Sequence, residues 1–167
     1  MKSLKTLVSL TALTVCMGAA SMASAATITP NGAFTTNAGT IVVTSPSSLG
    51  LPVTCGITFS GTVTGGVATI TGATLTGGGL CAVPVLKNIP SPGWVLTATA
   101  FNAGTGIGAG TVTGVGWTIT PGSDCGPSPL TVAWNQSTHT LSASSQTVSG
   151  NCSVRSLSVV APTLSLN

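Results

Sequence analysis

Hydrophobic and polar residues alternate most regularly between Cys55 and Cys81. From Ile57 to Val63, apolar residues or glycine occupy every second position, and threonine or serine stands between them. A period of two is typical of a strand with one buried face. Gly65-Gly66 then supplies a tight turn, because glycine accepts the positive φ that hairpin turns need. The pattern predicts a β-hairpin that runs between the two cysteines.

The same pattern returns between Cys125 and Cys152, where Leu130, Val132 and Trp134 alternate with smaller or polar residues. A turn dipeptide follows the first cysteine by ten residues in both segments. The second cysteine follows the first by 26 residues in one segment and by 27 in the other. A register shared by strand, turn and cysteine indicates an internal repeat of two disulfide-closed hairpins.

The remaining chain also alternates in short runs, and no window shows helical periodicity. Further strands are expected at residues 26–36, 39–45, 94–101, 111–120, 153–160 and 163–166, with 82–86 extending the first hairpin and the glycine-rich 102–110 as a loop. About ten short antiparallel strands with turns between them predict an all-β fold, either a β-sandwich or a barrel. The three tryptophans are in phase with apolar neighbours, so we expect them in the core.

The first 25 residues have the composition of a secretory signal. Lys2 and Lys5 precede an apolar run, and Ala23-Ser24-Ala25 fits the small-x-small rule for signal peptidase. The run is too short for a retained membrane anchor. Lipoprotein processing at Cys16 is the other alternative, but Val15 fits that signal poorly. We therefore expect a signal peptide at 1–25 and one all-β domain at 26–167, with repeats at about 40–90 and about 115–162.

Four cysteines remain after this cleavage, namely Cys55, Cys81, Cys125 and Cys152. An even number in an exported chain predicts disulfides, and four cysteines allow three pairings. The repeat favours Cys55–Cys81 with Cys125–Cys152. A metal site is the alternative, but the chain has no Cys-x-x-Cys and His139 is its only histidine. We expect no metal and no cofactor.

Charged side chains are very rare, because residues 26–167 carry only Lys87, Asp124 and Arg155. Two isolated cations make no phosphate-binding stripe, so nucleic acid is not an expected partner. Lys87 and Arg155 are expected to be solvated charges near strand edges, or to pair with a carboxylate on a partner. A surface of hydroxyl groups has little charge repulsion and should associate with itself or with apolar interfaces. The alternative is an ordinary soluble β protein rich in threonine and serine.

No catalytic residues are expected. Asp124, His139 and one of the many serines could form a catalytic triad, but no motif marks a nucleophilic serine. Asp124 stands in a Pro-Gly turn, where an aspartate side chain commonly hydrogen-bonds to the backbone. A glycosidase needs two carboxylates, and only one is present after residue 25. The glycines of residues 104–110 are followed by a strand, whereas a phosphate-binding loop needs a helix.

The cysteine-containing units, the PSPGWVLTATAF segment and the TVAWNQSTHTLSAS hairpin together resemble a family. The chain is similar, over nearly its whole length, to the exported bacterial proteins called protein-like activators of alkane oxidation, the Pra family and notably its PraB type. The resemblance implies a secreted protein that promotes growth on long-chain hydrocarbons.

We therefore expect a secreted, non-enzymatic accessory to alkane assimilation, extracellular or associated with the cell surface. Hydrocarbon or a biosurfactant interface is the expected partner, with self-association as a further expectation and no transmembrane segment after signal cleavage. The alternative is a structural protein of the cell surface or biofilm matrix, an adhesin or a fibre that assembles through strand edges. An enzyme is the third class, and the chain lacks the acid–base groups that an enzyme would need.

Overall fold

The computed structural model describes residues 26–167, so the expected signal peptide and Cys16 lie outside the described residues. The fold in this range is built from strands and two short 3-10 turns. The strands are β1 (Ile28–Thr29), β2 (Gly32–Thr35), β3 (Gly39–Thr44), β4 (Val53–Thr64), β5 (Val67–Thr76), β6 (Val85–Leu86), β7 (Trp94–Asn102), β8 (Ile107–Ile119), β9 (Ser123–Asn135), β10 (Thr140–Val148), β11 (Cys152–Val160) and β12 (Ser165–Leu166). The turns are η1 (Pro46–Ser48) and η2 (Gly79–Cys81).

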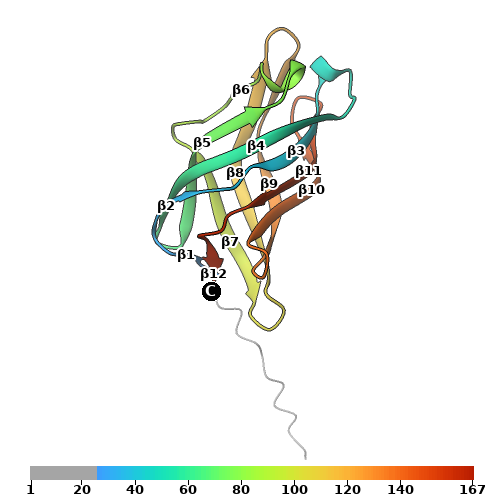
Figure 1. Ribbon diagram of the computed structural model, residues 1–167. Helices are drawn as coiled ribbons and strands as arrows, with labels where there is room; N and C mark the ends of the chain where they lie inside the picture. Colours follow the sequence, from blue (N-terminus) through green and yellow to red (C-terminus); the bar gives the residue numbers. More distant parts are fainter. Residues whose placement is uncertain (1–25) are drawn as a thin grey trace, which may run out of the picture.

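Eight of these strands close into an antiparallel barrel. The neighbours follow the order β4-β3-β11-β10-β9-β8-β7-β5, and β5 pairs with β4 to complete the ring. β2 pairs with β4 and β6 with β8 outside the ring, while β1 and β12 form a separate two-stranded sheet. The all-β expectation is confirmed, and of its two alternatives the barrel is correct (Figure 1). The main strands are longer than expected, up to 13 residues in β8 and β9.

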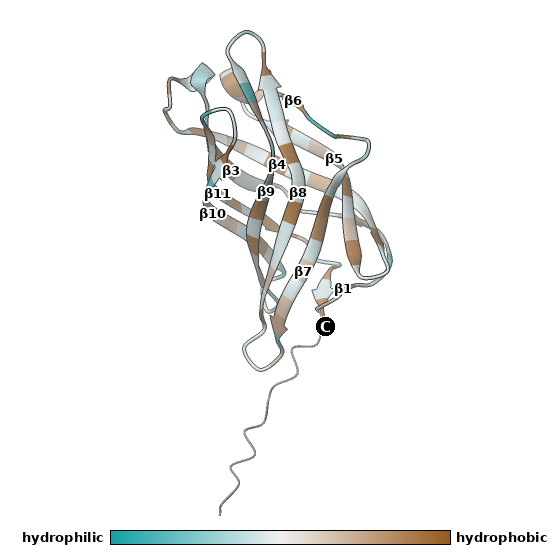
Figure 2. Ribbon diagram, turned by 180° about the vertical axis from the view of Figure 1, so that it is seen from behind, coloured by the Kyte–Doolittle hydropathy of each residue, from teal (hydrophilic) through white to brown (hydrophobic). Residues whose placement is uncertain are grey.

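The interior of the barrel holds one apolar core. Figure 2 shows hydrophobic and hydrophilic residues alternating along the strands, as a period of two requires when one face is buried. Trp94, Trp117 and Trp134 are each at most 6% exposed, which confirms that the tryptophans belong to the core. An eight-stranded barrel is just wide enough for side chains to fill its interior or to hold one small ligand.

The two cysteine segments differ in how they pair. β4 and β5 form a long hairpin, from Thr64↔Val67 back to Gly56↔Thr76. β9 and β10 pair over only three positions beside their turn, while β9 pairs with β8 and β10 with β11 along most of their length. The disulfides are Cys55–Cys81 and Cys125–Cys152, the pairing that the repeat favours. The second disulfide therefore joins β9 to β11 where β9 and β10 have separated.

Two expected segments are wrong in detail. β8 begins at Ile107, so only residues 103–106 of the glycine-rich stretch form a turn. Gly108 and Gly110 are buried strand residues, and a Cβ at Gly110 would lie 2.7 Å from the Thr97 carbonyl oxygen. Close packing therefore explains these glycines better than flexibility. After Cys81 the chain does not extend the hairpin, because the strand at residues 85–86 pairs with β8 instead.

One end of the barrel is closed by β1 and β12. Ile28 pairs with Leu166, and both side chains are buried together with Leu164. These three side chains meet the barrel residues Leu96, Ala98, Val132, Trp134 and Leu141 around a cavity of only about 20 Å³. Figure 1 places this pair of strands at the end opposite η1 and η2. We call it the closed end.

Gln136 fastens the closed end through one side-chain oxygen. Its Oε1 accepts hydrogen bonds from Trp134 Nε1 at 2.7 Å and from the Leu166 N–H at 3.0 Å.

Gln136→Leu should lower the free energy of unfolding by about 2 kcal/mol, because a buried donor left without an acceptor costs about 1–3 kcal/mol. Urea unfolding followed by tryptophan fluorescence measures this. Gln146→Leu is the matched control, since Gln146 accepts only from the exposed Thr131 N–H, and equal losses in both variants would contradict the assignment.

Candidate functional site

A cavity of about 60 Å³ lies inside the barrel, away from the closed end. Its lining is almost entirely aliphatic or aromatic. The lining residues are Ile41, Val43, Ser45, Val53, Cys55, Ile57, Phe59, Ile70, Leu75, Leu80, Pro84, Leu86, Trp94, Val112, Val115, Trp117, Ile119, Leu130, Val132, Leu141, Val154 and Leu157. Only Ser45 among them carries a hydroxyl group. Enclosed apolar cavities stay dry and can bind apolar molecules.

The cavity is partly open to solvent at the end opposite β1 and β12. Leu80, Pro84 and Leu86, from the segment that contains η2 and β6, line it and are half-buried. The Cys55–Cys81 disulfide joins η2 to β4 beside them. The segment over the opening is therefore held in place covalently.

Exposed aliphatic side chains surround this open end. Leu49 is 88% exposed, Leu51 65%, Val83 51% and Val85 68%. We call these four residues the apolar rim. Val85 pairs with Thr118 at the end of β8, and the loop of Leu49 is bonded to Ser123 at the start of β9, so the rim stands on both sides of the β8–β9 turn. Most of the large hydrophobic residues exposed in residues 26–167 thus lie at one end of the barrel.

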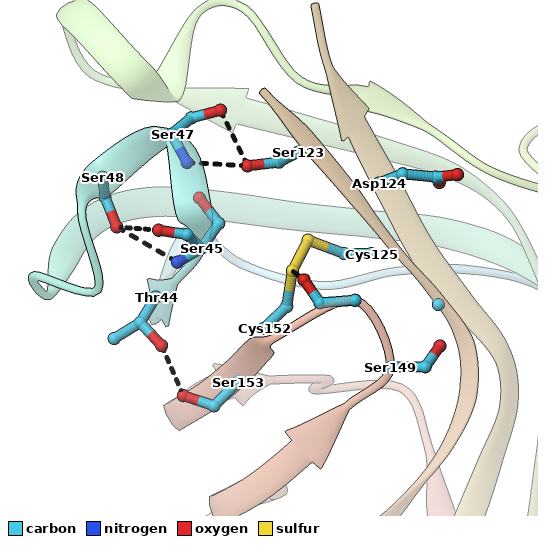
Figure 3. Close-up of a disulfide and its surroundings, with 12 residues drawn as sticks. Thr44, Ser45, Ser47, Ser48, Ser123, Asp124, Cys125, Ser149, Cys152 and Ser153 are labelled. Carbon is cyan, nitrogen blue, oxygen red and sulfur yellow. Dashed lines mark hydrogen bonds between the residues drawn. A yellow bond between two sulfur atoms is a disulfide. The ribbon is translucent and has the colours of Figure 1, made fainter. Parts of the chain in front are cut away.

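The loop that carries Leu49 and Leu51 is fixed by serine side chains (Figure 3). The buried Ser48 hydroxyl oxygen accepts a hydrogen bond from the Ser45 N–H at 3.1 Å. The same hydroxyl group donates a hydrogen bond to the Leu51 carbonyl oxygen at 2.8 Å. Ser123 Oγ accepts from the Ser47 N–H at 2.9 Å and bonds the Ser47 hydroxyl at 2.7 Å. The Cys125–Cys152 disulfide lies close to these serines. The loop therefore presents its leucines from a rigid base.

Leu49 has an unusual backbone for a leucine. Its φ is 54°, in the left-handed region that glycine and asparagine favour. A leucine there costs about 1–2 kcal/mol relative to the right-handed region, and its exposed side chain gains no burial in return. The side chain is thus neither needed for packing nor favoured by the turn.

Two of the three charged residues pair with each other beside the rim, because Thr118 of β8 pairs with Val85 of the rim and with Asp124. Lys87 donates to the Asp124 carboxylate and to the Gly126 carbonyl oxygen at 2.7 Å, and its side chain is 24% exposed. The expectation of a solvated Lys87 is therefore wrong, because the chain itself supplies the carboxylate. Asp124 belongs to β9 and bonds Lys87, so the expected backbone-bonding turn aspartate is also wrong. Arg155 is exposed on β11.

The candidate triad residues do not come together. Asp124 stands at the start of β9, whereas His139 follows the end of β9 and its Nδ1 lies 2.8 Å from the Leu164 carbonyl oxygen at the closed end. Within residues 26–167, no three His, Cys, Asp or Glu side chains group as metal ligands do. No helix in the described part of the chain is long and apolar enough to cross a membrane. Sequence reasoning missed the cavity and the rim, although the two leucines of Ser48-Leu49-Gly50-Leu51-Pro52, in a turn, are a visible signal.

Comparison with known proteins gives one family. The chain matches the family described as alkane oxidation protein activator PraA/PraB-like over residues 1–167. No curated protein and no solved structure matches it. The family is described as an activator rather than as an enzyme. The family match spans the whole chain, which therefore belongs to the PraA/PraB-like activators of alkane oxidation.

Proposed function

We propose that this protein is a secreted, non-enzymatic accessory that promotes alkane oxidation by adsorbing at the interface between oil and water or between oil and cell. The apolar rim is the surface that touches the oil. The observation that carries the proposal is the collection of exposed aliphatic side chains at one end of a barrel. The two disulfides are compatible with the oxidising environment outside the cell.

The free energy of adsorption comes from removing the rim from water. Full burial of a valine or leucine side chain contributes about 1.5–3 kcal/mol, so four exposed side chains supply several kcal/mol. Little opposes this, because the only ion pair in residues 26–167, Lys87–Asp124, has no net charge. The exposed Asp124 carboxylate lies beside the rim, and its pairing with Lys87 lowers the cost of bringing this charge to a hydrocarbon surface.

Closure of the barrel favours adsorption over assembly through strand edges. A free edge offers unpaired backbone groups to another chain. In residues 26–167, β3 to β5 and β7 to β11 have neighbours on both sides, and the strands outside the ring have at most four residues. The adhesin or fibre alternative is therefore left with these short outer strands and with the stretch where β9 and β10 have separated.

Substituting the rim leucines should weaken adsorption without weakening the fold. In Leu49→Asn/Leu51→Ser, asparagine tolerates the left-handed backbone at position 49, and both sites are exposed. The adsorption constant at a hexadecane–water interface should fall at least tenfold, since 1.4 kcal/mol corresponds to a factor of ten. Interfacial tension measured against protein concentration, with protein purified after export, checks this.

Ile107→Ser is the matched control for the rim variant. Ile107 is 48% exposed at the β7–β8 turn, near the closed end, so its loss should leave adsorption unchanged. An equal effect of both variants would contradict an oriented contact. In cells, growth on hexadecane should fall when the gene is deleted and recover with added protein. His139→Asn should restore growth as well as the unchanged protein does, whereas failure would point to chemistry at the imidazole.

A further inference from the structure

We propose that the interior cavity binds the end of one unbranched alkyl chain, which enters between the η2 segment and the apolar rim. This inference rests on the proposed function, and it adds a ligand class and a binding site to it. Adsorption alone would need only the outside of the rim. The cavity lets the protein take a single hydrocarbon chain out of the oil.

The chemistry of the lining selects hydrocarbon. Ser45 is the only lining residue with a hydroxyl group, and none of the lining residues is charged. No buried side-chain nitrogen or oxygen in residues 26–167 lacks a hydrogen-bond partner. A carboxylate, a sugar or an amide would lose its water on entering and find no replacement, at a cost of several kcal/mol. An alkyl chain makes no hydrogen bonds to water, so it loses none on entering the cavity.

The shape of the cavity selects a linear chain. On β8 the lining extends from Val112 to Ile119, which is roughly 20 Å along the strand at about 3.3 Å per residue. A volume of about 60 Å³ between these residues corresponds to only about four to six water-sized spheres. The space is therefore narrow, and it suits the terminal carbons of a straight chain better than a ring or a branched cage.

The two ends of the barrel fix the direction of entry. Ile28, Leu164 and Leu166 fill the closed end, so a chain cannot pass through from that side. The half-buried Leu80 and Leu86 stand at the opening, and Val85 of the rim precedes Leu86 on β6 with its side chain on the other, exposed face. The chain end would lie inside, and the part that does not fit would lie across the aliphatic rim.

Bromoalkane quenching of tryptophan fluorescence tests the proposal, because a bromine atom quenches indoles that it contacts. Trp94 and Trp117 line the cavity, whereas Trp134 lines only the small cavity of the closed end. 1-Bromooctane should quench saturably with one site per protein, and Trp134→Phe should raise the quenched fraction. 1-Bromoadamantane, a rigid cage, should not quench saturably. Equal saturable quenching by both bromides would overturn the proposal.

Two neighbouring valines of β3 give a matched pair of variants. Val43 lines the cavity, while Val42 is also half-buried but points to the other face of the strand. Val43→Phe fills the space and should weaken 1-bromooctane binding at least tenfold, whereas Val42→Phe should bind as the unchanged protein does. If Val43→Phe does not fold, Leu80→Phe at the opening serves in its place, with the same expected loss. Unchanged binding in the filled variant would overturn the proposal.

Adsorption measured on the same variants separates the two proposals. Val43→Phe should adsorb normally at the hexadecane interface and fail only in 1-bromooctane binding. Leu49→Asn/Leu51→Ser should lose adsorption and still bind 1-bromooctane saturably, with a smaller loss of affinity than Val43→Phe, because only the part of the chain outside the cavity touches the rim. Loss of adsorption in a normally folded Val43→Phe variant would overturn the division of roles between cavity and rim.

Discussion

Replacing Cys125 and Cys152 together by alanine is expected to lower the free energy of unfolding by about 3.5 kcal/mol. The disulfide closes a loop with a sequence separation of 27 residues, and constraining a loop of that length in the unfolded chain gives roughly this value. Both cysteines are at most 3% exposed, so the variant also loses buried contacts. Against a total stability of about 5–15 kcal/mol for a typical domain, this is a large fraction. Urea unfolding with linear extrapolation measures it.

The other disulfide provides the control for this prediction. Cys55–Cys81 has a separation of 26 residues, so Cys55→Ala/Cys81→Ala should lose almost the same stability if the constraint acts on the unfolded chain. It should differ in function, because only this disulfide holds the η2 segment beside the opening of the cavity. We expect weaker 1-bromooctane binding in this variant and normal binding in the Cys125/Cys152 variant. A loss below about 1 kcal/mol in both would contradict the chain-entropy reasoning.

Trp94→Ala should lower the free energy of unfolding by about 3–5 kcal/mol, the range for removing a large aromatic side chain from a core. Trp94 is 5% exposed, and its ring packs edge-on against Phe59 with centroids 6.1 Å apart. Its indole N–H donates to the Lys87 carbonyl oxygen at 2.8 Å. The substitution therefore removes packing, an aromatic pair and a hydrogen bond together.

Trp94→Phe separates these contributions. Phenylalanine keeps most of the apolar burial but cannot donate to the Lys87 carbonyl, so its loss should be about 1–2 kcal/mol, close to the value of one hydrogen bond and its packing. Thermal unfolding followed by circular dichroism compares both variants with the unchanged protein. A Trp94→Ala variant as stable as Trp94→Phe would show that the ring contributes little to the core.

Local alternation in the sequence was enough to predict most of the strands. Ile57 and Phe59 point inward at adjacent inward-facing positions of β4, and both are buried as their spacing implies. The disulfide pairing followed from the shared register of the two cysteine segments. These features depend on residues that are close in sequence, where the period of two acts directly.

Features that depend on distant segments could not be predicted in this way. Lys87 and Asp124 are 37 residues apart and meet because β6 and β9 both pair with β8. The ring closes through β4 and β5, which no local pattern requires. The cavity arises from side chains of many strands whose volumes do not quite fill a barrel. The glycines of β8 were misread because their packing partners, such as Leu166, are far away in sequence.

Both covalent bridges stand at the end that would meet the oil. Cys81 is part of η2, and Cys125 lies two residues after Ser123, which anchors the Leu49 loop. Proteins that settle on an oil surface tend to spread and lose their fold there, because their apolar cores can turn outward. Here the two disulfides make the end that carries the rim resist such spreading. The closed end, where β1 and β12 pair without a disulfide, would unfold first. A protein with this arrangement should keep its fold when it leaves an oil droplet, and it should be able to adsorb to another droplet.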